Sequence, residues 1–256
     1  MQKSANLISS IKIWLPGLSK ISDSLNRSCK KKSIQVVHSP IIQVEQIHQS
    51  DIVAFINWAD ILVFSSKQGV KYFFDQLQNY DVEVLIFKKN KFIVAIGEAT
   101  EKSILNRDLE VGFKPNDFSS KGLIVEIEKN IGFWQDKKVL LVGAKEPRLE
   151  LSQFLTQSGI DYKMLPVYET AVVKKIGTEV ADLMHNKSID WVIFSSPSTV
   201  RGFKQYFGNA TIKVASIGKT TSKELFDNDF LIDFESQSSM IDDIIKEIAK
   251  LEGIKL

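Results

Sequence analysis

Short apolar runs alternate with amphipathic stretches along almost the whole chain. Residues 61–64 read ILVF, which predicts a buried strand, and residues 69–78 place Val70, Phe73 and Leu77 on one helical face. The same patterns predict strands over 11–15, 33–37, 61–64, 91–96, 139–142, 161–165, 191–194 and 213–217, and helices over 19–30, 69–78, 98–106, 148–157, 200–207, 219–227 and 238–251. Strands that alternate with helices at this spacing predict an α/β fold with parallel sheets covered on both faces.

The chain also contains an internal repeat. Residues 60–77 match residues 190–207 at a shift of 130, including the pairs Asp60/Asp190 and Phe64/Phe194. A second block, AIGEATEKSIL from residue 95, matches SIGKTTSKELF from residue 216 at a shift of 121. Because the two blocks keep their order, we interpret them as a duplication that produced two similar α/β units.

Each repeated block places small hydroxyl or glycine residues where a strand ends and a helix begins. These residues are Ser65, Ser66, Gly97 and Thr100 in one copy and Ser195, Ser196, Ser198, Gly218, Thr220 and Thr221 in the other. The carboxyl ends of parallel strands form the edge where ligands bind, and the N–H groups of the following helices attract carboxylates or phosphates there. The alternative is that these residues only cap helices, which Ser, Thr and Gly commonly do.

Composition narrows the possible functions. Hydrophobic residues make up 44% of the 256-residue chain and charged residues 25%, enough for a sizeable core. One cysteine and three dispersed histidines argue against a disulfide scaffold or a metal site. The net charge of +2 and the absence of an apolar stretch of about 20 residues argue against nucleic acid and membrane as partners. We expect a cytoplasmic monomer that uses no metal.

Several familiar motifs are incomplete or missing. GKTT at Gly218 resembles the end of a phosphate-binding P-loop, but that loop needs a glycine five residues earlier, where this chain has Lys213. Neither GxGxxG nor GxSxG occurs. Any enzymatic chemistry must therefore proceed without a bound nucleotide or a catalytic triad.

Four segments in this order resemble the uroporphyrinogen-III synthase family: AIGEAT at 95–100, PVYET at 166–170, FSSPSTV at 194–200 and KVASIGKTTSKEL at 213–225. The resemblance implies two Rossmann-like (flavodoxin-like) domains, one inserted in the other. Residues 1–36 and 171–256 would form the first domain and residues 44–165 the second, with extended linkers at 37–43 and 166–170. From the residues alone, two consecutive domains divided near Asn130 remain equally possible.

The resemblance also implies a reaction. Members of this family convert linear hydroxymethylbilane into uroporphyrinogen III, with loss of water and inversion of the terminal pyrrole ring, and use no cofactor. The substrate is a linear tetrapyrrole with eight carboxylates. Tyr168 matches the family tyrosine that assists departure of the hydroxyl group, a role that suits a phenol because it stays protonated at neutral pH. The alternative for Tyr168 is a purely architectural role.

Further site residues follow from the same comparison. Thr100, Ser196, Lys213, Thr220 and Thr221 match polar positions of the family site, and Ser65 and Ser66 are counterparts from the repeat. Arg148 matches an arginine that would bind a substrate carboxylate or pair with a local acid. For Lys213 the alternative is a solvated strand end.

Two segments depart from the family pattern. The first strand ends Trp14-Leu15-Pro16, where many members have Thr-Arg-Pro, and the third turn reads Ala144-Lys145-Glu146-Pro147, where glycine is usual. Both changes remove groups that suit an anion. They leave open a second class of function, a two-domain module that binds a polyanion without catalysis.

Overall fold

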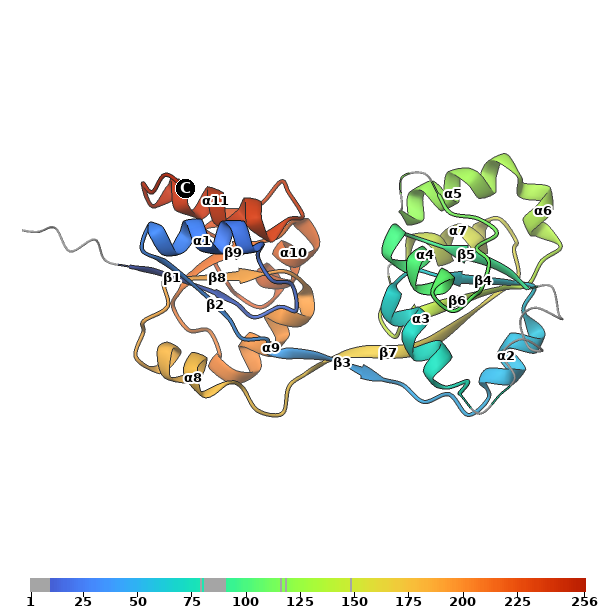
Figure 1. Cartoon of the computed structure of the whole chain (residues 1–256), viewed down its shortest axis with the longest axis horizontal. Coiled ribbons are helices and arrows are strands. Elements are labelled where there is room, and N and C mark those ends of the chain that lie inside the picture. Colours follow the sequence, from blue (N-terminus) through green and yellow to red (C-terminus); the bar gives the residue numbers. More distant parts are fainter. Residues whose placement is uncertain (1–9, 79, 81–90, 116, 118, 148) are drawn as a thin grey trace, which may run out of the picture. The chain divides into compact units, whose positions relative to one another are not determined.

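Figure 1 shows a computed structural model of the chain, which describes residues 10–78, 80, 91–115, 117, 119–147 and 149–256. The chain divides into two compact units. Unit 1 contains Met1–Gln43 and Thr170–Leu256, and unit 2 is the continuous segment Val44–Glu169. Asn130 lies inside unit 2, so the alternative division near that residue does not occur.

Unit 1 is built on a five-stranded parallel sheet with the strand order β10-β9-β8-β1-β2. Its strands are β1 (Ile11–Leu15), β2 (Ile34–His38), β8 (Trp191–Phe194), β9 (Lys213–Ser216) and β10 (Phe234–Glu235). Strands β1 and β8 are hydrogen-bonded neighbours that come from distant parts of the chain. This long-range pair joins the β1–β2 half of the sheet to the β8–β9–β10 half.

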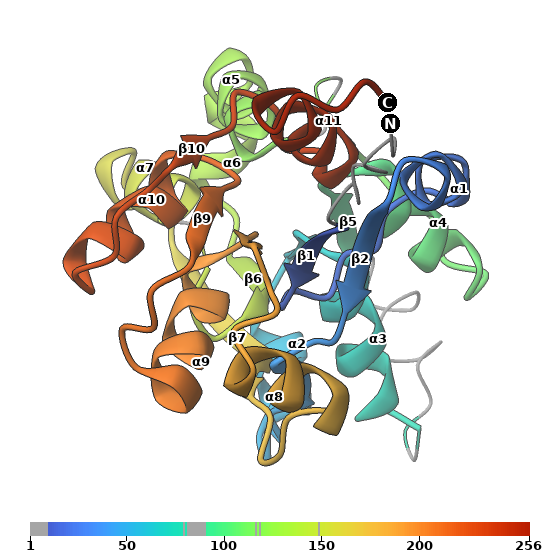
Figure 2. The same cartoon turned by 90° about the vertical axis from the view of Figure 1, so that its left-hand side faces the viewer.

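Helices cover both faces of the unit 1 sheet. They are α1 (Asp23–Lys31), α8 (Thr178–His185), α9 (Pro197–Phe207), α10 (Lys219–Asp227) and α11 (Ile241–Leu251). Along β8, Ile193 packs with α1 and α11, whereas its neighbours Val192 and Phe194 pack with α8, α9 and α10. Figures 1 and 2 show α1 and α11 on one side of this sheet and α8 and α9 on the other. Because both faces are covered, the central strand β8 consists entirely of buried apolar residues.

Unit 2 contains most of a second five-stranded sheet, with the order β3-β7-β6-β4-β5, of which residues 42–43 and 170–172 belong to unit 1. Its strands are β3 (Ile42–Gln46), β4 (Ile61–Phe64), β5 (Phe92–Ala95), β6 (Val139–Ala144) and β7 (Tyr162–Val172). The pairs β4·β5, β4·β6 and β6·β7 are parallel. Strand β3 is antiparallel to β7, because the Ile47 N–H donates to the Val167 carbonyl and the Val173 N–H donates to the Ile41 carbonyl.

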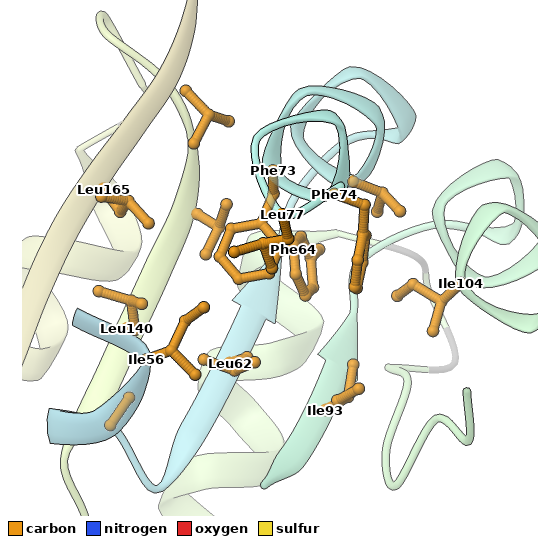
Figure 3. Packing of buried hydrophobic residues seen from close by; sticks show 14 of the residues in the cluster. Ile56, Leu62, Phe64, Phe73, Phe74, Leu77, Ile93, Ile104, Leu140 and Leu165 are labelled. Carbon is orange, nitrogen blue, oxygen red and sulfur yellow. The ribbon is translucent and has the colours of Figure 1, made fainter. Parts of the chain in front are cut away.

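The helices of unit 2 form two layers around this sheet. They are α2 (Ile52–Trp58), α3 (Lys67–Asp75), α4 (Glu98–Leu105), α5 (Ser120–Lys129), α6 (Ile131–Gln135) and α7 (Glu150–Gln157). Leu62 and Phe64 of β4 pack with α2, α3 and α4, and the alternate residues Ile61 and Val63 pack with α5, α6 and α7. Figure 3 shows Phe64 against Phe73 of α3, with ring centroids 5.2 Å apart.

The two units share one structural detail, as expected if they arose by duplication. In unit 1 the Lys12 N–H donates to Asp190 Oδ2 at 2.8 Å, and in unit 2 the Lys138 N–H donates to Asp60 Oδ2 at 2.9 Å. Each aspartate lies just before a strand and fixes the start of the neighbouring strand. Strands β8 and β1 therefore correspond to β4 and β6, and the predicted α/β fold with two similar, mainly parallel sheets is confirmed.

Some predicted boundaries are wrong. The helix expected over 19–30 begins at Asp23, because the Ser22 side chain accepts from the Leu25 N–H and caps it there. The strand expected over 161–165 continues to Val172, so the predicted linker 166–170 is part of β7. The predicted linker 37–43 contains the end of β2 and the start of β3. Four helices, α2, α5, α6 and α8, were not predicted.

Candidate functional site

A cavity of about 460 Å³ lies at the carboxyl edge of the unit 2 sheet. Its lining includes six hydroxyl-bearing residues, Ser65, Ser66, Ser119, Ser120, Ser152 and Tyr168, together with Glu146 and apolar residues that include Val63, Ile96, Leu141, Leu151 and Met164. We call it the unit 2 cavity. It opens between β4 and β6, whose following helices α3 and α7 pack on opposite faces of the sheet. Where the helices that follow two neighbouring parallel strands lie on opposite faces, a crevice forms between them, and α/β proteins bind ligands there.

Ser65 and Ser66 line this cavity directly after β4. The Ser66 hydroxyl caps helix α3, because its oxygen accepts the Gly69 N–H at 3.0 Å. Ser65 is exposed and lies against Gly143 of β6, where an added Cβ atom would come 3.0 Å from the Ser65 hydroxyl. Both serines therefore line the cavity, and Ser66 also caps helix α3.

Tyr168 reaches the cavity from β7. The pairing of β6 with β7 shifts between Gly143 and Ala144, which pair with Pro166 and Tyr168, so Val167 is an extra residue in β7. Such bulges change the direction of a strand and often lie next to functional sites. The Tyr168 hydroxyl lies 3.0 Å from the Ser66 hydroxyl, and its ring packs against Tyr72 with centroids 6.0 Å apart. The structure thus brings together three predicted site residues, Ser65, Ser66 and Tyr168.

Charged groups lie near the edge of the cavity. Lys145 pairs with Glu169 at 2.8 Å, and the hydrogen bond to that carboxylate raises the pKa of the Lys145 ammonium. Glu146, the next residue, lines the cavity. The altered third turn therefore contributes one acidic side chain to the cavity and one lysine that is already paired with an acid.

Sequence reasoning missed Ser119, Ser120, Ser152 and Glu146 as lining residues. Ser119 caps helix α5 by accepting the Gly122 N–H at 3.1 Å, and Ser152 donates to the Leu149 carbonyl within α7. The only signal in the sequence was a weak similarity between the segment around Ser119 and the serines near residue 238. No pattern indicated that these serines would lie near Ser65.

The second predicted turn of unit 2 lies beside the cavity. Gly97 has a φ of 100°, a conformation that favours glycine, and precedes α4. Thr100 is only 3% exposed and lies within the packed start of that helix. Ile96 lines the cavity, whereas Gly97 and Thr100 are not among its lining residues. Arg148 lies outside the described residues.

In unit 1, Ser195, Ser196 and Ser198 follow β8 as predicted. Ser196 caps α9 in a reciprocal arrangement with Thr199, and its hydroxyl lies 2.9 Å from that of Ser198. A side chain at Gly17, which follows β1, would collide with the Ser195 hydroxyl. The turns after β1 and β8 are therefore closely packed at this edge of the sheet.

The turn at Gly218 uses its backbone N–H internally. Gly218 N–H donates to the Ser216 hydroxyl at 3.2 Å, and the Ser222 hydroxyl donates to the same oxygen at 2.9 Å. Thr221 is 2% exposed, whereas Thr220 is exposed. From the sequence, the Gly218 N–H was predicted to bind a ligand. Its bond to Ser216 was not predicted.

Lys213 lies apart from these turns. It begins β9 and pairs with Trp191 at the start of β8, so it is at the amino edge of the sheet, whereas Gly218 follows the carboxyl end of β9. Lys213 forms a 2.6 Å ion pair with Glu252, which raises the pKa of the lysine and lowers that of the glutamate. Within unit 1, the structure does not bring Lys213 together with the other predicted site residues.

The described part of the chain has neither a membrane-spanning helix nor a metal-binding cluster. Within it, no helix is long and apolar enough to cross a membrane. Nor do its histidine, cysteine, aspartate and glutamate side chains form a group of three or more that would hold a metal ion.

Two mainly parallel α/β units, one with a cavity between β4 and β6 at the carboxyl edge of its sheet, define a two-domain protein of the Rossmann-like class. A family model described as uroporphyrinogen-III synthase HemD matches residues 23–246. The chain therefore belongs to the uroporphyrinogen-III synthase family, an enzyme family of porphyrin biosynthesis.

Curated relatives agree with this family. A porphyrin biosynthesis protein HemD of Ruminiclostridium josui is 26% identical over 171 residues, which cover 66% of this chain and 32% of that protein. The chain thus spans about a third of the length of that relative. The uroporphyrinogen-III synthase of Saccharomyces cerevisiae is 21% identical over 242 residues, which cover 84% of this chain and 86% of that protein.

Two solved structures share the fold. Uroporphyrinogen-III synthetase of Helicobacter pylori matches with a TM-score of 0.66 and 19% identity over 94% of this chain and 99% of that chain. A mutant uroporphyrinogen III synthase of Thermus thermophilus matches with a TM-score of 0.58 and 13% identity over 95% and 99% of the two chains. At these identities the likeness concerns the fold.

Proposed function

We propose that this chain is a uroporphyrinogen-III synthase: it closes hydroxymethylbilane into uroporphyrinogen III, with loss of water and inversion of the terminal pyrrole ring, and needs no cofactor. The observation that carries the proposal is the family match over residues 23–246. The same match favours catalysis over the alternative of a polyanion-binding module.

Tyr168 is the proposed catalytic residue. As the C–O bond of the hydroxymethyl group breaks, the adjacent pyrrole nitrogen supplies electrons and an electrophilic azafulvene forms. The phenol of Tyr168 donates a hydrogen bond to the departing oxygen, and the proton that the pyrrole nitrogen releases as the azafulvene forms converts the departing hydroxide into water. The terminal ring then attacks the azafulvene carbon through the ring carbon that already carries its methylene link to the neighbouring ring. That older C–C bond breaks and re-forms at the other α carbon of the terminal ring, which loses its proton, so the remaining task of the protein is to hold that ring in the inverting orientation.

The unit 2 cavity suits part of this substrate. Its volume of about 460 Å³ lies in the range of pockets for drug-sized ligands, whereas a tetrapyrrole with eight carboxylates is larger. We therefore assign the cavity to one ring and its carboxylate arms. The hydroxyls of Ser65 and Ser120 and the starts of α3 and α5 supply hydrogen-bond donors for a carboxylate there.

The other predicted substrate-binding residues remain part of the proposal. They are Gly97, Thr100, Arg148, Ser195, Ser196, Ser198, Lys213, Gly218, Thr220 and Thr221. Lys213 and Gly218 have the weakest support, since Lys213 is paired with Glu252 and the Gly218 N–H with Ser216.

The test measures which isomer forms. Purified protein supplied with fresh hydroxymethylbilane should yield the type III product, whereas spontaneous closure yields type I. Tyr168→Phe should reduce the rate by on the order of 10²-fold, the lower range for loss of a proton donor, without unfolding the chain. Tyr72→Phe is the matched control, because the Tyr72 hydroxyl bonds only the Val44 carbonyl among the described residues.

Two outcomes would contradict the proposal at different levels. A product mixture identical to that of the reaction without protein would eliminate synthase activity. Type III product formed equally fast by wild type and Tyr168→Phe would keep the synthase but assign Tyr168 the architectural alternative.

A further inference from the structure

The Ser66 hydroxyl occupies an unusual position between a helix end and a phenol. Its oxygen accepts the Gly69 N–H at 3.0 Å, at the start of α3, and lies 3.0 Å from the Tyr168 oxygen. A serine hydroxyl has one proton to donate and two lone pairs that accept. The Gly69 N–H occupies one lone pair, which leaves the proton of Ser66 and one lone pair for Tyr168.

The direction of the Ser66–Tyr168 hydrogen bond decides where the phenol proton points. If Tyr168 donates to Ser66, its proton points at Ser66 and is not available to a ligand. If Ser66 donates to Tyr168, the phenol proton stays available to a ligand in the unit 2 cavity. In that case the donors run in one direction, from Gly69 N–H through the Ser66 hydroxyl to the Tyr168 hydroxyl. Hydrogen bonds in such a chain polarise one another, and the positive end of a helix favours this direction.

We propose that Ser66 is a positioning residue, which fixes the Tyr168 hydroxyl and turns its proton toward the substrate. This role rests on the proposed synthase function. It differs from the substrate contact predicted for Ser66 from the sequence, because Ser66 here acts through another side chain.

The rest of Tyr168 is held independently of Ser66. Its carbonyl accepts the Lys145 N–H at 2.9 Å, and its ring packs against that of Tyr72. The start of α3 packs closely against β6, since an added Cβ atom on Gly69 would come 3.3 Å from the Val142 carbonyl. With both partners held in place, the remaining freedom at Tyr168 is rotation of its proton, which Ser66 restricts.

The internal repeat shows that the tyrosine contact is an addition to a capping serine. Ser196, the counterpart of Ser66, also caps its helix, by accepting the Thr199 N–H. Its hydroxyl lies near that of Ser198, and no tyrosine is among its partners in the part of the chain that the structure describes. Capping therefore explains the serine in both copies, whereas the contact with Tyr168 belongs to unit 2.

A double-mutant cycle on the full chain tests this role. Ser66→Ala should lower kcat for type III formation roughly tenfold, as expected for one hydrogen bond, with a smaller effect on KM. Ser66→Thr, which keeps a hydroxyl, should recover most of that loss. In the Tyr168→Phe background, Ser66→Ala should cause no further loss, since the phenol proton that Ser66 directs is gone.

Ser22→Ala controls for the loss of a helix cap, because Ser22 caps α1 by accepting the Leu25 N–H and lies outside the proposed site. Because the Ser22 hydroxyl also donates to Asp242, this variant should lower stability at least as much as Ser66→Ala and leave kcat unchanged. Multiplicative losses in the double mutant, or a Thr variant as slow as the Ala variant, would overturn the positioning role. A wild-type protein that forms no type III isomer would overturn the synthase function, and the role of Ser66 with it.

Discussion

At the scale of single residues, the protonation of His38 is linked to the folding of unit 1. Its Nε2 atom lies 3.1 Å from the Gly17 carbonyl, in the turn that follows β1. Burial lowers the pKa of the imidazole, and the charge of Lys20 adds to this effect, while the hydrogen bond to Gly17 opposes it. The folded protein therefore favours neutral His38 more than the unfolded chain does.

This difference predicts the direction in which stability changes with pH. The unfolded chain takes up a proton at His38 near pH 6.5, whereas the folded protein resists it until lower pH. The contribution of neutral His38 is fully present above about pH 6.5 and is lost as the pH falls toward the lowered pKa. His38→Gln should flatten the urea-unfolding stability curve between about pH 7.5 and 5.5. A variant that parallels wild type throughout would contradict this assignment.

Residue positions were predicted better than residue partners. The sequence placed Ser66 after a strand and, through the family resemblance, Tyr168 in the site. Their hydrogen bond depends on the bulge at Val167, and hydrophobic periodicity carries no signal for one extra residue in a strand. The Gly218 N–H was assigned to a ligand because the conformation that brings it to Ser216 is invisible in the sequence. Lys213 was predictable as a strand start, a position that places it at the amino edge.

At the scale of elements, apolar runs predicted the central strands well and the helix starts less well. Runs such as ILVF are buried on both faces, so little else fits them. Helix starts depend on which of several serines caps the first turn. The helix predicted to start at residue 19 starts at Asp23, because Ser22 is its cap. Helices α2 and α6 have only seven and five residues, too short for a clear helical period, and their N-cap residues Asp51 and Asn130 form no side-chain cap hydrogen bond. Strand β7 is longer than predicted, because its second half pairs with β3.

The capping assignments are themselves testable in α5. Ser119 accepts the Gly122 N–H, whereas the adjacent Ser120 is the first residue of the helix and does not cap it. Ser119→Ala should cost about 1 kcal/mol of unfolding free energy, because the Gly122 N–H loses its partner. Ser120→Ala, the matched change one residue later, should cost clearly less. Chemical denaturation of both variants decides the matter, and equal losses would show that Ser119 is no more important than its neighbour.

At the scale of the whole molecule, the chain leaves and re-enters unit 1 through hydrogen-bonded neighbours. The Val173 N–H donates to the Ile41 carbonyl, so the two segments that connect the units lie side by side. An inserted domain is tolerated where its two ends are close together. The repeat revealed two similar units from sequence, but not which strands close each sheet. That assignment depends on long-range pairs such as β1 with β8, for which only the family resemblance gave a basis.

This arrangement predicts that unit 2 folds alone. Both of its hydrophobic clusters use only buried residues between Ile52 and Val167, so removing unit 1 deprives them of no buried partner. A fragment of residues 42–172 should show a single cooperative unfolding transition with native-like helix content. A variant with residues 44–169 replaced by a short Gly-Ser linker should likewise retain unit 1, because Ile41 and Val173 are already hydrogen-bonded.

Activity should not survive this separation, although folding should. The predicted substrate-binding turns are divided between the units, with Ser65, Ser66 and Tyr168 in one and Ser195 and Thr220 in the other. The fragment of residues 42–172 should therefore fail to form the type III isomer, alone or mixed with the linker variant at low concentration. Type III product from the fragment alone would restrict the site to unit 2 and remove the unit 1 turns from the reaction. An unfolded fragment would show instead that its two clusters do not suffice for stability, despite their complete burial within one unit.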